Sequence, residues 1–272
     1  MKTRNIIIGI AVLLLSVISF FGYFIYKFER LEDRHIRLVE GEVNNIQLIN
    51  LGEGDRAYIA RVINQVNSCS PAVIALDITF ATYDSTSIND SLLLTSISTS
   101  NTILAARYKM GTIYDVHSNF LDSAYDCGYA QVEVDEDNYV IDFSIYEKKY
   151  KSLYEKNHGA KKIFHFAYKI ANEFDSIAAA KYLKDTVHPR TPIVISRLTD
   201  QFNIHDYQDL DFPCDDLRGK IVILGYLGPT NEDKHTTYAR YHTKKYYGTN
   251  EPDMYGPIIV ANQILMILEG IH

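Results

Sequence analysis

Three short apolar runs without polar alternation mark the centre of the fold. They are residues 72–76, which end at Asp77, residues 102–106, which end at Arg107, and residues 221–224, which Gly225 follows. A strand with no polar face is covered on both sides, as the central strands of parallel sheets are. We therefore predict an α/β fold with a mostly parallel central sheet built on these three runs and flanked by helices.

The remaining periodic segments add outer strands, helices and a hairpin to this sheet. Further strands are predicted at residues 46–51 and 192–195. Helices are predicted at residues 56–67, 90–98, 161–183 and 256–270, the last ended by Gly270. Two alternating segments, 129–134 and 139–146, flank the polar residues 135–138 and predict an added β-hairpin.

The first apolar stretch of the chain has a different length and character. Residues 6–26 carry no charge, and about 20 helical residues at about 1.5 Å each span the roughly 30 Å hydrocarbon core of a membrane. The stretch is longer than the core of a signal peptide and lacks a small-residue cleavage site. We therefore predict a transmembrane helix that stays on the chain.

This anchor divides the chain into four predicted parts. They are a short cytoplasmic tail at 1–5, the anchor at 6–26, a stalk or connector at 27–42 and an extracytoplasmic domain at 43–272. Positive charges flank the anchor almost equally, so the positive-inside rule alone does not orient it. We expect the amino terminus inside, because a short tail before a long domain is the usual signal-anchor arrangement. The location predicted is the cell membrane, with a single span.

Composition narrows the classes of partner and of site. With 272 residues, 47% of them hydrophobic, the chain can bury a sizeable core, and a net charge of −7 argues against nucleic acid as a partner. Its three cysteines, Cys69, Cys127 and Cys214, have no metal-type spacing and allow at most one intrachain disulfide. We expect buried, unpaired thiols, no metal site and no cofactor.

Acidic residues follow the predicted central strands. Asp77 leaves one strand directly, and Asp233 and His235 lie in the loop after another. Ligands collect at the carboxyl ends of the strands in open α/β sheets. We therefore predict a ligand-binding site made of Asp77, Asp84, Asp233 and His235, with Asp90 nearby. The alternative is that Asp77 hydrogen-bonds the following loop and the other acids face solvent.

The sequence gives little support to catalysis or to nucleotide binding. Gly225 and Gly228 follow a strand, but no third glycine and no Walker lysine accompany them. No serine elbow and no zinc-protease motif occurs either, so we assign no catalytic residue. The long loop at 228–248, rich in tyrosine, is either a ligand lid or a surface loop that packs on itself.

Landmarks along the chain occur in an order that resembles a known sensor family. They are ALDITF at 75–80, Asp84 and Asp90, NTILAARY at 101–108, the hairpin at 128–146, LRGKIVILGYLG at 217–228, Asp233, and GPIIVANQILMIL at 256–268. Together they resemble the type-two CHASE family, the cyclase- and histidine-kinase-associated sensory extracellular domain. The hairpin turn has Asn138 where that family usually has glycine, and Asn138 can also adopt the left-handed conformation.

The resemblance implies a signal-transduction role. It implies a non-catalytic, membrane-anchored sensory module that binds an unknown small molecule or protein signal. It also implies an output domain beyond further membrane helices, or a membrane or cytoplasmic signalling partner, with a homodimer as an option. Two alternatives remain open: a catalytic α/β domain that uses the strand-end aspartates, and a structural partner in an envelope complex.

Overall fold

The computed structural model describes residues 16–23, 34–109, 112–149, 161–206, 213–228, 230–243, 245, 249 and 251–271. Residues 16–23 are helical with exposed side chains, and the rest of the predicted span at 6–26 lies outside the described residues. Among the helices in the described part of the chain, none has both the length and the apolar character needed to cross a membrane. The limits proposed for the four parts of the chain stay predictions.

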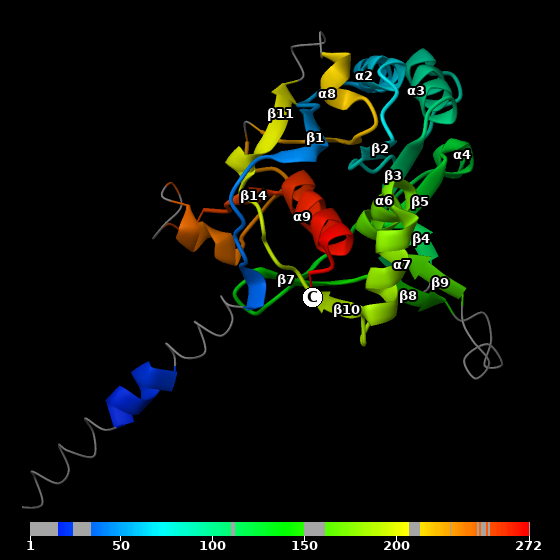
Figure 1. Cartoon of the computed structure of the whole chain (residues 1–272). Helices are drawn as coiled ribbons and strands as arrows, with labels where there is room; N and C mark the ends of the chain where they lie inside the picture. The colour runs from blue at the N-terminus through cyan, green and yellow to red at the C-terminus, as the bar shows by residue number, and fades with distance from the viewer. Residues whose placement is uncertain are drawn as a thin grey trace, which may run out of the picture.

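A mostly parallel sheet forms the centre of the domain, as predicted (Figure 1). Its parallel strands lie in the order β11, β1, β12, β2, β3, and β5 pairs with β3 on the far edge. Their bounds are β1 Val43–Asn50, β2 Val73–Leu76, β3 Thr102–Lys109, β5 Asp126–Tyr129, β11 Phe202–Asp206 and β12 Ile221–Gly225. The short strand β4 (Thr112–Tyr114) pairs with β3 in the antiparallel direction.

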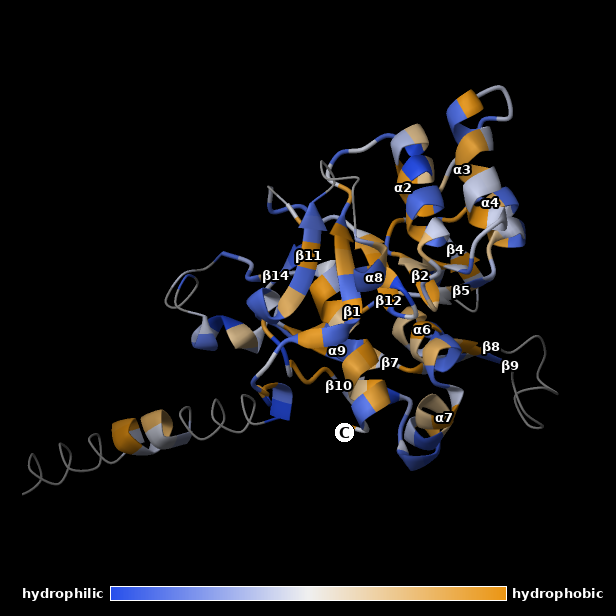
Figure 2. Ribbon diagram, turned by 45° about the horizontal axis from the view of Figure 1, so that its top comes forward, coloured by the Kyte–Doolittle hydropathy of each residue, from blue (hydrophilic) through white to orange (hydrophobic). Residues whose placement is uncertain are grey.

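Helices cover both faces of this sheet and create two hydrophobic cores (Figure 2). One face packs on α2 (Arg56–Ser68), α3 (Ile88–Ser98), α4 (Ser118–Ser123) and α8 (Cys214–Leu217). The other packs on α6 (Phe166–Phe174), α7 (Ser176–Asp185) and α9 (Gly256–Glu269). Every residue of α9 from 257 to 267 is buried. A helix that is apolar all round needs such a position inside the fold.

Smaller sheets extend the domain beside the central layer. The predicted hairpin forms from β6 (Glu133–Val134) and β7 (Val140–Ser144), and β10 (Arg190–Pro192) adds a third strand to it. Its turn residue Asn138 has a φ of 64°, so it takes the expected left-handed conformation. The remaining short elements are β8 (Tyr146–Lys149) with β9 (Lys161–Phe164), β13 (Lys234–His235) with β14 (Met254–Tyr255), and the 3₁₀ turns Thr199–Gln201 and Tyr238–His242.

The prediction of one helix over residues 161–183 was wrong. Residues 161–164 form the strand β9, and two helices follow with a break at Asp175. The Asp175 carboxylate accepts hydrogen bonds from the backbone N–H groups of Ile177 and Ala178, so it caps the second helix. Capping of this kind starts a new helix and competes with continuation of the old one.

The connector before the domain pairs with a segment far along the chain. Residues 34 and 35 are helical, and residues 36–39 pair with the segment that follows β10. Ile195 donates a backbone hydrogen bond to His35, and Arg37 donates one back to Ile195. The strand predicted at 192–195 therefore does not form as such. The strand β10 ends at Pro192, and Ile195 forms a single parallel bridge with Ile36.

Two of the three cysteines are joined, which corrects the expectation of unpaired thiols. Cys69 caps the end of α2 and Cys214 begins α8, and the two form a disulfide with Cα atoms 4.8 Å apart. The sequence could not show this pairing, because 145 residues separate the two cysteines. Cys127 is free and partly buried, and burial raises the pKa of its thiol to about 12.

The central strand gives a direct test of the fold. Ile223 is fully buried in β12 between β1 and β2. Ile223→Asp would bury a carboxylate without a partner, so we expect a loss of about 4 kcal/mol or more and no cooperative thermal unfolding by circular dichroism. Ile204→Asp is the matched control, because Ile204 is 38% exposed on the edge strand β11. Cooperative melting of Ile223→Asp near the wild-type temperature would contradict the central position of β12.

Candidate functional site

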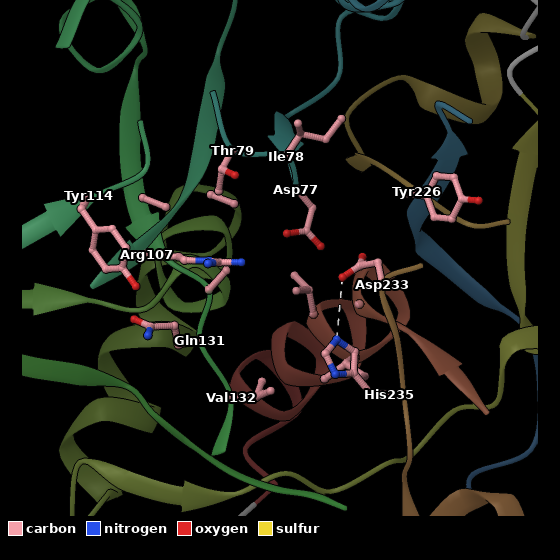
Figure 3. A pocket seen from close by; sticks show the side chains of 16 residues that line it. Asp77, Ile78, Thr79, Arg107, Tyr114, Gln131, Val132, Tyr226, Asp233 and His235 are labelled. Atoms are coloured by element: carbon pink, nitrogen blue, oxygen red, sulfur yellow. Dashed lines mark ion pairs between the residues drawn. The ribbon is translucent and has the colours of Figure 1, made fainter. Parts of the chain in front are cut away.

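A cavity of about 560 Å³ opens at the carboxyl ends of β2, β3 and β12, beside the first turn of α9. Figure 3 shows the side chains that line it. The polar residues of its lining are Asp77, Thr79, Arg107, Tyr114, Gln131, Tyr226, Asp233 and His235. The rest of the lining is made of Ile78 after β2, Ala105 and Ala106 on β3, Ala130 and Val132 after β5, and Gly256, Ile259 and Val260 of α9. The topology of the parallel sheet brings these distant segments to one edge.

Asp77 lies at the exit of β2 with its backbone held in place. Its N–H donates to the carbonyl of Leu224 on β12, over 2.8 Å. Its carboxylate is partly buried, and within the described residues no hydrogen bond or ion pair reaches it. Burial and the nearby charge of Asp233 raise the pKa of Asp77 to about 7, although His235 acts in the opposite direction. Ionisation of this carboxyl group is therefore costly in the protein.

Asp233 brings a second carboxylate to the amino-terminal end of α9. Its backbone carbonyl accepts a hydrogen bond from Gly256, the first residue of that helix. A Cβ atom on Gly256 would lie 2.6 Å from Asp233 Oδ2, so glycine is needed for this close approach. Asp233 itself has a φ of 58°, a left-handed conformation that few residues other than glycine adopt. The partial positive charge of the helix end favours the carboxylate there.

His235 completes the acidic side of the cavity. It lies in β13, which pairs with β14 just before α9, so the strand pair places it next to Asp233. Its Nε2 atom is 3.7 Å from Asp233 Oδ1. Both side chains remain open to solvent, with exposed fractions of 34% and 43%. An open pair at this distance can contact a ligand but does not exclude water from it.

The opposite side of the cavity carries a positive charge. Arg107, Tyr114 and Gln131 lie across from Asp77 and Asp233 in Figure 3, and the Arg107 guanidinium points into the space between them. Arg107 forms an ion pair with Asp115, with 3.4 Å between the guanidinium nitrogen and the carboxylate oxygen. The side chain of Arg107 is 61% exposed. In the described structure no ion pair joins Arg107 to Asp77 or Asp233.

The structure places Asp84 away from this cavity, contrary to the expectation of one joint cluster. Asp84 is exposed in the loop before α3, where bonds from Thr86 lower the pKa of its carboxylate. Asp90 is buried in α3 and pairs with Arg56. Burial alone would raise the pKa of the Asp90 carboxyl. The hydrogen bonds from Arg56 and from the Asp84 N–H together outweigh burial, so the pKa is lowered. These two acids therefore stabilise a loop.

The tyrosine-rich loop at 228–248 forms neither a lid nor a free surface loop in its described part. It reaches the cavity only through Asp233 and His235. Tyr238 is buried and stacks between His35 of the connector and Tyr139 of the hairpin, with ring centroids 5.5 and 4.7 Å away. The loop therefore joins the connector to the hairpin.

Several cavity residues were absent from the predicted site. Arg107 directly follows the predicted strand at 102–106, and Tyr226 lies two residues after the one at 221–224, so the strand-end rule that selected Asp77 could have found them. Gly256 begins a helix that was predicted, but its closeness to Asp233 depends on how the chain folds back. Tyr114 lies on β4, a strand that was not predicted. Gln131 falls in the segment 129–134 that was predicted as a hairpin strand, but it lies between β5 and β6.

The donor set fits an organic ligand better than a metal ion. Among the described residues, no three His, Cys, Asp or Glu side chains are grouped closely enough to hold a metal ion. The cavity instead combines two carboxylates, one imidazole, one guanidinium and an apolar wall. Small-molecule sites commonly have this character, with a mostly apolar lining and a few polar groups that orient the ligand.

The comparison with protein families agrees with this architecture. The family model of the CHASE2 domain matches residues 7–272, which is nearly the whole chain. No curated protein and no solved structure shows a significant match to this chain. The match runs through every segment that builds the cavity, from the exit of β2 to the first turn of α9. The chain therefore belongs to the CHASE2 family, a family of extracellular sensory domains.

Proposed function

We propose that this protein is a membrane-anchored sensory module that binds a small molecule in the cavity at the carboxyl ends of β2, β3 and β12. One observation carries the proposal: a roomy cavity contains a partly buried carboxylate, Asp77, for which the described protein supplies no partner. Proteins seldom leave a buried charge unpaired unless function requires it. A ligand that pairs with Asp77 would remove this cost, so binding and stability would be coupled.

The same geometry supports a route from the cavity to the connector. The first turn of α9 lines the cavity, and Asn262, which lies six residues after Gly256 in the same helix, is fully buried. Its Oδ1 atom accepts from the backbone N–H groups of Ser196 and Arg197, each over 2.9 Å. Its Nδ2 atom donates to the carbonyls of Arg197 and Ile258. Displacement of α9 would therefore act on residues 196 and 197.

Those residues belong to the segment that holds the connector. Ser196 accepts a backbone hydrogen bond from Val39, and Ile195 bonds to His35 and Arg37. The connector follows directly on the predicted anchor at 6–26, so it is the segment through which a change in the domain would reach the membrane. This contiguous set of hydrogen bonds supports a sensor, because a sensor must couple its site to its anchor.

Catalysis is a second candidate that one observation favours. Two neighbouring acids whose ionisation is driven apart are typical of acid–base enzymes, and the pKa of Asp77 is raised to about 7. The exposed fractions of Asp233 and Arg107, 43% and 61%, argue against it, since acid–base sites usually exclude water. Membership of a sensory family also favours binding alone. Turnover that Asp77→Asn abolishes would establish the catalytic alternative.

The disulfide and the predicted anchor together support an extracytoplasmic location. Disulfides persist in oxidising compartments and are rare in the cytosol. The Cys69–Cys214 pair joins α2 to α8 inside the domain itself, so the domain would be folded in such a compartment. The cell membrane with the domain outside, as predicted from the anchor, is consistent with this.

The location can be tested by topology and thiol counting. A reporter that is active only outside the cytoplasm should be active when fused after His272. Of the three cysteines, alkylation of the denatured, unreduced chain should modify only Cys127, and reduction should make all three reactive. Activity of a cytoplasm-only reporter, or three reactive thiols before reduction, would contradict the location.

The cost of the Asp77 charge predicts an unusual pH dependence of stability. The folded-state pKa is raised from 3.8 to about 7. The folded protein therefore retains a proton that the unfolded chain releases, and this contribution to stability is lost as pH rises from about 4 through about 7. We expect Asp77→Asn to melt at a higher temperature than wild type above about pH 7, and we expect the difference to shrink as pH falls from about 7 to about 4.

Thermal unfolding of the full chain in detergent micelles measures this effect. Asp122→Asn is the matched control, because Asp122 is an exposed acid on α4 and should show no comparable gain. A melting temperature of Asp77→Asn that stays at or below the wild-type value at every pH would contradict the unpaired, buried state of Asp77.

Ligand binding itself can be tested with a library of soluble metabolites. We expect at least one compound to raise the melting temperature of the full chain, and Ala130→Trp to abolish the effect by filling the cavity that Ala130 lines. Ala81→Trp is the control, because Ala81 is exposed and lies outside the cavity. If no compound distinguishes wild type from Ala130→Trp, the proposal of a small-molecule sensor fails.

A further inference from the structure

The cavity presents charges of both signs on facing sides without pairing them. Asp77 and Asp233 lie on one side, Asp77 at the exit of β2 and Asp233 just before β13, against the amino-terminal end of α9. Arg107 lies on the other, at the end of β3, with its guanidinium directed into the cavity (Figure 3). Opposite charges inside one protein normally pair when they are within reach. Their separation here leaves each of them available to a ligand.

The acidic side suits a positively charged amine. Its two carboxylates converge from different elements, and Gly256 lets the Asp233 carboxylate come close against the backbone of α9. A metal ion is disfavoured, since no three suitable side chains gather within the described chain. An ammonium group needs less: two or three acceptor oxygens and a strong negative field.

The basic side suits an acidic group on the same molecule. The Arg107 guanidinium would repel a ligand that carries only positive charge and attract one with a carboxylate at its far end. The exposed ion pair with Asp115 holds Arg107 only weakly, since pairs open to solvent contribute little. A carboxylate could therefore share or replace Asp115 through the planar fork of the guanidinium.

The middle of the cavity suits a short apolar body. Ala105 and Ala106 on β3, Ala130 after β5, and Ile259 and Val260 of α9 contribute to the apolar part of its lining, and the three alanines have small side chains. The volume of about 560 Å³ accommodates a molecule of amino-acid or dipeptide size. The space between the charged sides is thus apolar and limited in size.

We propose that the ligand is a small zwitterion of amino-acid type, with its ammonium group bound by Asp77 and Asp233 and its carboxylate bound by Arg107. This inference rests on the proposed sensory function and specifies its ligand class. Recognition of both ends fixes the length and the charge pattern of the ligand. The apolar wall then selects among side chains, and the open rim beside His235 and Tyr226 leaves room for a larger one.

The test measures binding of the common L-amino acids, and of their matched derivatives, to the full chain in detergent micelles. The N-acetyl derivative lacks the positive charge, and the carboxamide derivative lacks the negative charge. We expect at least one amino acid to bind at millimolar concentration or below. Its N-acetyl and carboxamide forms should each bind about 10-fold or more weakly, because a charge-assisted hydrogen bond is lost in each case.

Two variants assign each charge to its partner. Asp77→Asn should weaken binding of the amino acid and of its carboxamide alike, and it should leave the already weak binding of the N-acetyl form unchanged. Arg107→Gln should weaken binding of the amino acid about 10-fold or more and leave binding of the carboxamide unchanged. Asp84→Asn and Arg218→Gln are matched controls on exposed residues outside the cavity, and they should bind as wild type does. Melting of each unliganded variant confirms that it is folded.

The outcomes separate this inference from the function on which it rests. If no amino acid binds, or if binding survives removal of either charge, the zwitterion inference is overturned. The sensory function stands in that case if a metabolite of another class stabilises wild type but not Ala130→Trp. If no metabolite of any class does so, both fall together. Binding with the crossed pattern of derivatives and variants supports both.

Discussion

Burial of β12 on both faces is the constraint on which the rest of the structure depends. All five of its residues are buried, and its four apolar side chains divide equally between the two hydrophobic cores on either side of the sheet. A strand in this position needs a parallel neighbour on each edge and helices above and below. β1 and β2 supply the edges, so the exits of β2 and β12 must meet at one end of the sheet. The cavity lies where these exits meet.

Close packing at that end restricts which residues can follow the strands. A Cβ atom on Gly225, the last residue of β12, would lie 2.5 Å from Pro257 of α9, and one on Gly256 would collide with Asp233. Glycines at both places bring α9 against the sheet edge and the Asp233 carboxylate against α9. Gly225, one of the two glycines that resemble a phosphate-binding turn in sequence, therefore serves helix packing.

The sequence predicted the parts of this arrangement that depend on local pattern. Apolar runs located the central strands, and the strand-end rule brought Asp77, Asp233 and His235 to one cavity. It could not separate Asp84 from them, because the Arg56–Asp90 pair that holds its loop elsewhere joins residues 34 apart. The Cys69–Cys214 disulfide, the docking of the connector and the Gly256–Asp233 contact were missed for the same reason. Each depends on segments distant along the chain.

The connector gives the unpaired charges of the cavity a consequence beyond binding. Asn262 satisfies all its hydrogen-bonding groups with the helix and with residues 196–197, so α9 and that segment behave as one unit. The connector is bound to the same segment by backbone hydrogen bonds, and Tyr238 packs on His35 behind it. A change in the balance of charge at the amino-terminal end of α9 would therefore act on a body that includes the connector. The positive group that we propose to bind between Asp77 and Asp233 would reduce the repulsion between their negative charges, and it would thereby change the force on that helix end.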